Sequence, residues 1–129
     1  MSEDTSGPKS SGDERLLSQS SNIRGRFFII ELLKMHNGCF ASVSEDESPR
    51  IGGITLTVKT DRRTASTSSL IPERKGSLFA SMLGELLAEK LGGLAVVSLY
   101  LKEEIDPDTM KTLINEVRKL VAKDLNPTP

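Results

Sequence analysis

The spacing of apolar residues changes once along the chain, and this change constrains the fold more than any other feature. Ile54, Leu56 and Val58 alternate with polar residues, a period of two that is typical of a half-buried strand. From residue 77 onward, apolar residues recur every three or four positions, which places them in one stripe along a helix. The chain therefore predicts strands first and helices later, a pattern of the α+β class.

Three further segments before this change predict strands. Arg26–Met35 is dense in apolar residues, and the Asn37-Gly38 dipeptide after it favours a tight hairpin that returns through Cys39–Val43. Residues 64–71 are rich in Thr and Ser and contain no large apolar residue before Leu70. We expect this last segment to form a polar strand at a sheet edge or against a partner.

The helical part contains two helices with a strand between them. The first is expected to begin at Gly76-Ser77, with the Ser77 hydroxyl as its cap, and to end at Gly92-Gly93. The second is expected to begin at Asp106, a good N-cap, followed by Pro107. Between them, residues 94–101 are nearly all apolar and predict a central strand buried on both faces. The apolar stripe of the first helix comprises Phe79, Met82, Leu83, Leu86, Leu87 and Leu91.

The predicted architecture is therefore α+β: a mostly antiparallel sheet packed with two amphipathic helices. The expected order is four strands, a helix, a strand and a helix. Residues 1–22 contain seven Ser and too few apolar residues to offset the ordering entropy, so we expect a disordered tail there. A short docking motif around Leu16-Leu17 is the alternative for that segment. Residues 23–125 are expected to form a single domain, followed by a frayed end at 126–129.

Composition excludes several functional classes. With 17 Lys and Arg against 18 Asp and Glu, and only 4% aromatic residues, the 129-residue chain lacks the excess of cations and the stacking platforms that nucleic-acid binders use. One Cys and one His exclude a disulfide framework and a metal site of three or four Cys and His ligands. Since the chain has no apolar run of about 18 residues and no secretory leader pattern, we expect an intracellular protein that does not span a membrane.

The residues that could carry chemistry do not form a convincing active site. Cys39 and His36 flank the predicted hairpin turn, but no carboxylate is placed to orient the imidazole, so a turn histidine and a half-buried thiol explain them better. The acidic run at residues 45–47 lacks the alternate spacing of a calcium loop. The glycine pairs do not fall within phosphate-binding motifs. We expect no enzyme, no cofactor and no metal.

A small domain with an unpaired sheet edge and no catalytic residues is commonly a pairing module, because such an edge must be covered or used. The polar strand at residues 64–71 is the part of this chain left available for that role. We expect Thr64, Ser66, Ser68, Leu70 and Ile71 to lie in or near a protein contact.

The same region carries a family resemblance. Thr64–Leu101 resembles the proteasome assembly chaperone 4 family, which shows an S-T-S-L-L stretch, a loop with a Ser, an A-x-x-L-A-x-K helix and a V-x-V-S-x-x-L strand. The related assembly chaperone 3 family shares this architecture, and the resemblance covers residues 26–124. The counterparts in this chain are Ser66–Leu70, Ser77, Leu86–Lys90 and Val96–Leu99.

The resemblance implies a non-enzymatic chaperone. Members of the family pair with a chaperone 3-type protein as a heterodimer, bind proteasome α subunits, α5 most prominently, and promote α-ring assembly. The resemblance implies no catalytic residue. Composition and the lack of a long apolar run predict no nucleic acid and no membrane partner, and we expect a location in the cytoplasm with the nucleus also allowed. The alternatives are a small roadblock- or longin-like scaffold or dimerisation module, an enzyme using Cys39, and weak RNA binding.

Overall fold

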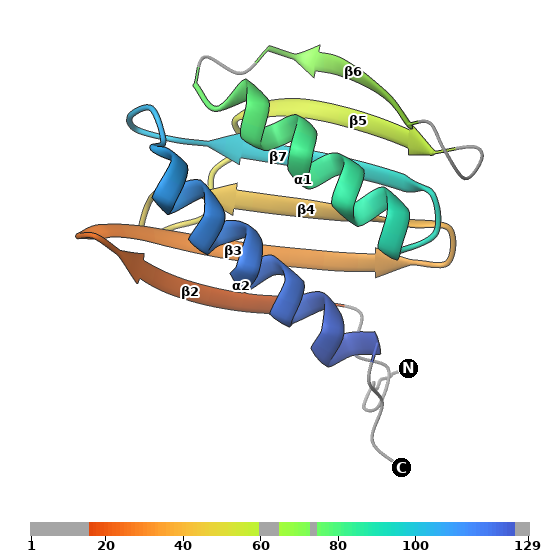
Figure 1. Cartoon of the computed structure of the whole chain (residues 1–129), viewed down its shortest axis with the longest axis horizontal. Coiled ribbons are helices and arrows are strands. Elements are labelled where there is room, and N and C mark those ends of the chain that lie inside the picture. The colour runs from red at the N-terminus through yellow and green to blue at the C-terminus, as the bar shows by residue number, and fades with distance from the viewer. Residues whose placement is uncertain (1–15, 60–64, 73–74, 126–129) are drawn as a thin grey trace, which may run out of the picture.

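The computed structural model describes residues 16–59, 65–72 and 75–125, which form one sheet with two helices laid across one of its faces (Figure 1). This two-layer arrangement confirms the predicted α+β class. The elements are β2 (Leu16–Ile23), β3 (Arg26–Met35), β4 (Gly38–Ser44), β5 (Gly53–Lys59), β6 (Ala65–Ile71), α1 (Ser77–Lys90), β7 (Leu94–Tyr100) and α2 (Pro107–Leu125).

The six strands lie in the order β2-β3-β4-β7-β5-β6. The β4–β7 pair is parallel, and every other neighbouring pair is antiparallel, so the sheet is mostly antiparallel as predicted. The chain leaves the sheet after β6, passes through α1 and returns to insert β7 between β4 and β5. This return makes β7 a central strand and leaves β6 at one edge and β2 at the other.

The first strand corrects the sequence analysis, which expected residues 16–22 to be disordered. They belong to β2, which pairs with β3 over its whole length, from Leu16 opposite Leu33 to Ile23 opposite Arg26. Composition could not show this, because the strand is stabilised by partners elsewhere in the chain. The rest of the expected tail, residues 1–15, and the expected frayed end, residues 126–129, lie outside the described residues.

Side chains of β2 make these distant contacts, and Ile23 at its end is buried in the hydrophobic core. Leu17 packs against the hydrophobic core, and Gln19 donates a hydrogen bond from its amide to the Glu116 carboxylate of α2. A two-residue turn, Arg24-Gly25, then connects β2 to β3 with φ values of 54° and 82°. Positive φ at both turn positions matches the right-handed twist of a tight hairpin.

The predicted β3–β4 hairpin is present, but its turn lies one residue earlier than expected. Gly38 pairs with Met35, so the connecting residues are His36 and Asn37 and not Asn37 and Gly38. Gly38 is needed for a different reason: a Cβ at this position would lie 2.4 Å from the carbonyl oxygen of Leu94. The glycine allows β4 to lie beside the start of β7.

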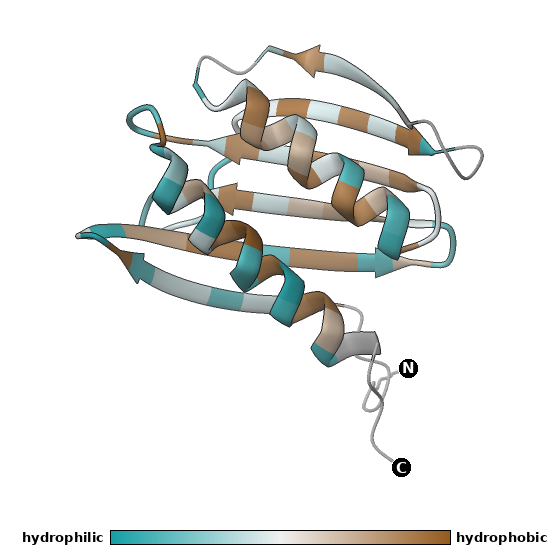
Figure 2. Ribbon diagram, viewed as in Figure 1, coloured by the Kyte–Doolittle hydropathy of each residue, from teal (hydrophilic) through white to brown (hydrophobic). Residues whose placement is uncertain are grey.

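The hydrophobic core lies between the sheet and the two helices. Figure 2 shows apolar residues running through the central strands, whereas both helices mix apolar and polar residues. In α1, the buried residues include the predicted Phe79, Leu83 and Leu87, but Met82 is 42% exposed, so its predicted place in the buried stripe is wrong. The small residues Ala80, Gly84 and Ala88 are buried in addition, because α1 approaches the sheet closely along that side.

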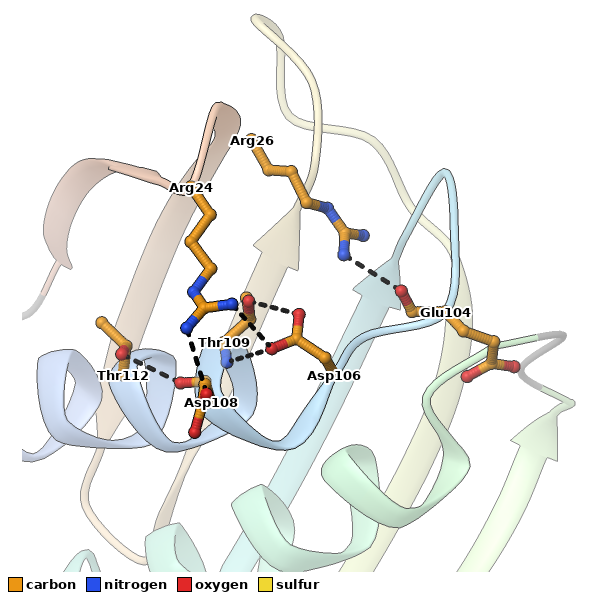
Figure 3. Close-up of polar contacts among 7 residues, drawn as sticks. All are labelled: Arg24, Arg26, Glu104, Asp106, Asp108, Thr109 and Thr112. Atoms are coloured by element: carbon orange, nitrogen blue, oxygen red, sulfur yellow. Dashed lines mark hydrogen bonds and ion pairs between the residues drawn. The ribbon is translucent and has the colours of Figure 1, made fainter.

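The helix ends agree with the sequence analysis at two of three positions. Asp106 caps α2 as predicted: its carboxylate accepts hydrogen bonds from the Thr109 backbone N–H at 3.1 Å and the Thr109 hydroxyl at 2.6 Å (Figure 3). Gly92 and Gly93, with φ of 107° and 110°, end α1 as predicted. The predicted Ser77 cap is wrong, because Gly76 occupies the N-cap position with φ 78° and Ser77 is the first helical residue.

Candidate interaction surface

The two helices cover only one face of the sheet, and we call the opposite side the open face. Alternate residues of a strand point to opposite faces, and β3 shows the division clearly. Phe28, Ile30 and Leu32 are buried in the core, whereas Phe27 and Leu33 on the open face are each 37% exposed. An antiparallel sheet with one solvated face normally places polar residues there, but β3 places mostly apolar residues there.

Strand register extends this apolar character across the sheet. Leu33 lies between Leu16 on β2 and Phe40 on β4. The same row continues across the sheet, because Phe40 is paired with Val96 on β7 and Val96 is paired with Leu56 on β5. The next row contains further apolar side chains. We call the residues of these two rows the apolar patch: Leu16, Leu33, Met35, Phe40, Leu56, Val58, Leu94 and Val96.

The apolar patch is accessible to solvent. Phe40, near its middle, is 51% exposed and Leu16, at its end, is 59% exposed, while Val96 and Leu56 are half-buried by their neighbours. Covering apolar surface contributes about 25 cal/mol for each Å² removed from water. A contiguous apolar surface of this kind on one side of a small domain is typical of a protein–protein contact.

The predicted partner-binding residues lie along the margin of this patch. Ser66 and Ser68 are exposed on β6 and lie opposite Val58 and Leu56. Leu70 and Ile71, at the end of β6, are 58% and 49% exposed. The structure thus places these four residues on an edge strand, as expected for β6, while their part in binding stays a prediction. Thr64 lies outside the described residues.

The centre of the patch was missed by the sequence analysis. Residues 94–101 were expected to be buried on both faces, but within β7 only alternate residues such as Ala95 and Val97 are buried, and Leu94 and Val96 are half-buried. A usable signal was present in the sequence. A strand that is apolar on both faces needs a covering layer on each side of the sheet. The two helices form one such layer on the six strands, so the other side of the sheet has none within this chain's described residues.

A second apolar feature lies where β5 begins and β6 ends. A cavity of about 330 Å³ there is lined by Ile51, Ile71, Lys75 and Tyr100 among others, and Ile51 is 78% exposed. The Arg50 guanidinium stacks over the Tyr100 ring at 5.5 Å and pairs with Asp46. The cavity lies at the end of these strands, where Ile71 is paired with Ile54 of the open face and the buried Leu99 and Leu101 also line it.

An ion pair lies at the same end of the sheet, beside the end of β7, where the Glu45 backbone N–H donates to the Tyr100 carbonyl. Arg26 contacts Glu45 through two hydrogen bonds of 2.7 and 2.9 Å, and the two side chains are only 18% and 9% exposed. The hydrogen bond from Arg26 lowers the pKa of Glu45 below its ordinary value, and a further bond from the Lys102 backbone N–H acts in the same direction.

The same guanidinium also anchors the loop before α2. Arg26 donates to the backbone carbonyl of Glu104 at 3.0 Å (Figure 3). It also donates to the backbone carbonyl of Glu103 at 3.0 Å. The neighbouring Arg24 forms an exposed ion pair with Asp108 at 3.0 Å. These groups hold the β7–α2 connection against the start of β3, and the carboxylates of Glu45 and Asp108 are both used in structural contacts.

The surroundings of Cys39 do not suit a catalytic nucleophile. Cys39 is 4% exposed, and burial raises the pKa of its thiol to about 11, whereas a nucleophilic cysteine needs an accessible thiolate. His36 is exposed in the turn. Within residues 16–59, 65–72 and 75–125, no group of three or more His, Cys, Asp and Glu side chains could hold a metal ion. No helix in this described part of the chain is long and apolar enough to cross a bilayer.

Comparisons with known proteins add one structural similarity. No protein-family model matches the chain, and no curated protein sequence matches it. A solved structure described as a novel chaperone complex for yeast 20S proteasome assembly is similar, with a TM-score of 0.47 and 13% sequence identity. The alignment covers 87% of this chain and 94% of that one. A similarity at this level carries no conclusion about function.

Proposed function

We propose that this chain is a non-enzymatic pairing module that acts as a proteasome assembly chaperone. The observation that carries the pairing is the apolar patch on the open face of the sheet. The resemblance of residues 26–124 to the assembly chaperone 4 family supports the biological setting. A chaperone of this kind needs a defined contact surface and no reacting groups.

The partner in this proposal is a second small chaperone, similar to assembly chaperone 3, whose own apolar surface covers the open face. Two sheets packed face to face lie about 10 Å apart and interdigitate their side chains. The helices of this chain would then lie on the outside of the pair. A specific interface buries about 1,200–2,000 Å² in total. The edge of this interface would be formed by the β6 residues Ser66, Ser68, Leu70 and Ile71.

The pair in turn would bind proteasome α subunits, with α5 as the first candidate, and promote assembly of the α ring. We place this activity in the cytoplasm and also in the nucleus. Fluorescence microscopy of the tagged chain tests the location, and exclusion from both compartments would contradict it.

The experiment is a pull-down of the tagged full chain from native cells, with mass spectrometry of the recovered proteins. We expect a small partner chaperone together with free α subunits, and not mature proteasomes. Phe40→Asp places a charge in the middle of the apolar patch and should lower recovery of the partner about tenfold or more. Leu78→Asp is the matched control, since Leu78 is 63% exposed on α1 in the helical layer, and it should retain the partner.

A second pair of variants tests the β6 margin separately. Ser68→Arg adds a long charged side chain beside Leu56, and Leu70→Asp places a charge at the end of the strand. Both should weaken the partner complex while thermal unfolding of the free chain stays unchanged. Full partner binding by both variants would show that β6 is not part of the interface.

The scaffold alternative makes a different prediction for the same pull-down. Recovery of the bait alone, or of unrelated membrane-traffic proteins, would favour a roadblock- or longin-like module. Roadblock-like domains place a helix before the first hairpin, and in this chain the residues before the β2–β3 hairpin lie outside the described part, so the pull-down decides between the two. Cys39→Ala tests the enzyme alternative, and we expect this variant to keep the cellular function.

A further inference from the structure

The open face carries one charged side chain among the strand residues that the structure describes, and it is Glu31. This residue lies on β3, opposite Ser18 on β2 and Ser42 on β4, two positions from Leu33 on the same face. Glu31 is half-buried. It forms no ion pair or side-chain hydrogen bond with any residue in the described part of the chain.

Covering the open face would take this carboxylate out of water. A buried charge without a counter-charge is strongly unfavourable, whereas a buried ion pair is tolerated when hydrogen bonds satisfy its remaining groups. Ser18, Ser42 and Ser98 share the row of Glu31 across the sheet. Their hydroxyls could complete the hydrogen bonding of such a pair.

The described strand residues on the open face of a second copy offer no counter-charge. Its strand positions there are apolar or Ser, apart from Gly38, Asn22, Tyr100 and Glu31 itself, within the described residues. Arg50, beside Tyr100, is already paired with Asp46 at 2.5 Å. Self-pairing strand against strand through this face would therefore bury two carboxylates with no cation opposite either of them among the described strand residues.

We infer that Glu31 determines pairing specificity: it selects a partner chain that presents a Lys or Arg on its facing apolar surface, and it prevents this chain from pairing with itself. This inference rests on the proposed pairing through the open face. An unsatisfied charge directed against the wrong partner is a common way for similar interfaces to discriminate. Arg suits the role best, because its planar guanidinium contacts a carboxylate through two hydrogen bonds.

The first test needs no partner and measures self-association of the full chain by analytical ultracentrifugation. Wild-type protein should sediment as a monomer. Glu31→Leu removes the charge and extends the apolar patch, so its self-association should tighten by about tenfold or more. Glu85→Leu, at an exposed position on α1, makes the same chemical change in the helical layer and should stay monomeric.

The double variant Glu31→Leu with Phe40→Asp assigns any new dimer to the open face, because it should return the protein to a monomer. Circular dichroism and thermal unfolding establish that each variant is folded. The inference is overturned if wild-type protein dimerises as tightly as Glu31→Leu, or if Glu31→Leu remains monomeric at every concentration at which wild-type protein is measured.

The second test uses the partner recovered with the wild-type bait, co-purified and titrated against each variant. Glu31→Gln keeps the shape of the side chain but leaves the partner's cation unpaired, so affinity should fall about tenfold or more, while Glu85→Gln should leave it unchanged. If Glu31→Gln binds as wild type does and Phe40→Asp does not, this inference fails and the proposed function stands. If Phe40→Asp also binds normally, pairing through the open face fails.

Discussion

At the scale of single residues, Gly84 shows how closely the helical layer lies on the sheet. A Cβ at this position would be 2.3 Å from the Thr57 hydroxyl oxygen and 3.3 Å from the Thr57 Cβ. Thr57 is fully buried on β5 and its hydroxyl lies 3.1 Å from that of Thr67 on β6, so it has little freedom to move. The glycine interrupts an otherwise good helical sequence because a larger residue does not fit.

We therefore predict that Gly84→Ala lowers the free energy of unfolding by about 1–3 kcal/mol, the usual cost of overpacking a core. Helix propensity favours alanine by about 1 kcal/mol, so a stabilised variant would contradict the packing argument. Urea denaturation measures the change, and Glu85→Ala at the neighbouring exposed position is the control, expected to change stability little. Adding Thr57→Ala should recover part of the loss in a double-mutant cycle.

Glu45 gives a prediction on pH dependence. Its pKa is held below the ordinary value of 4.5 mainly by the hydrogen bond from Arg26. The unfolded chain therefore takes up a proton at a higher pH than the folded chain. The stabilisation is present in full above about pH 4.5 and is lost as the pH falls through the pKa of the folded state.

Glu45→Gln should remove this part of the acid sensitivity and also leave the Arg26 guanidinium without its counter-charge. We expect a loss of about 3 kcal/mol near neutral pH, the low end for breaking a buried pair, and a smaller loss in acid. Denaturation curves across the pH range measure both effects. Glu103→Gln serves as the control, because Arg26 contacts the backbone carbonyl of that residue, and an equal pH profile in the two variants would contradict the assignment.

At the scale of elements, the β2–β3 hairpin is where sequence composition and structure disagree. Its turn requires positive φ at Arg24 and Gly25, and a Cβ at Gly25 would meet nothing within 4 Å. A side chain at residue 25 would therefore destabilise the folded state only through the backbone conformation that it must adopt. This makes the turn a clean test of whether β2 forms as described.

Gly25→Ala should lower the free energy of unfolding by about 1–2 kcal/mol, the cost of the left-handed conformation for an L-residue. Hydrogen exchange of the β2 amides should accelerate in the same variant. Arg24→Asn is the control, because Asn-Gly is a favoured dipeptide for this turn, and it should leave exchange in β2 slow. Equal exchange rates in wild type and Gly25→Ala would mean that β2 does not depend on this turn.

At the scale of the whole molecule, the sheet has one covered face and one open face, and pairing should therefore stabilise the fold. A partner that binds only the folded chain adds about 2.7 kcal/mol when its concentration is one hundred times Kd. We predict a corresponding rise in the melting temperature of wild-type protein and of Leu78→Asp on addition of the partner. Phe40→Asp should melt at the same temperature with and without it.

Much of the architecture could be predicted from local sequence. The period of two at Ile54–Val58, the helical spacing after residue 77, the Asp106 cap and the Gly92-Gly93 end all reflect interactions between neighbours in the chain. The sequence analysis also explained Cys39 as a half-buried thiol beside the hairpin turn, and the structure shows this residue buried with a raised thiol pKa. These features depend on few distant contacts.

Distant contacts decided the rest. Leu16–Ile23 is a strand because β3 and α2 lie beside it, and Met82 is exposed because Gly84 sets the side on which α1 meets the sheet. The open face depends on where both helices pack, which no local pattern specifies. The amino-acid sequence by itself predicted both helices and every described strand except Leu16–Ile23. Only the tertiary structure placed Leu33, Phe40 and Val96 in one exposed row with Glu31 beside it, because residues far apart in sequence become neighbours through strand register.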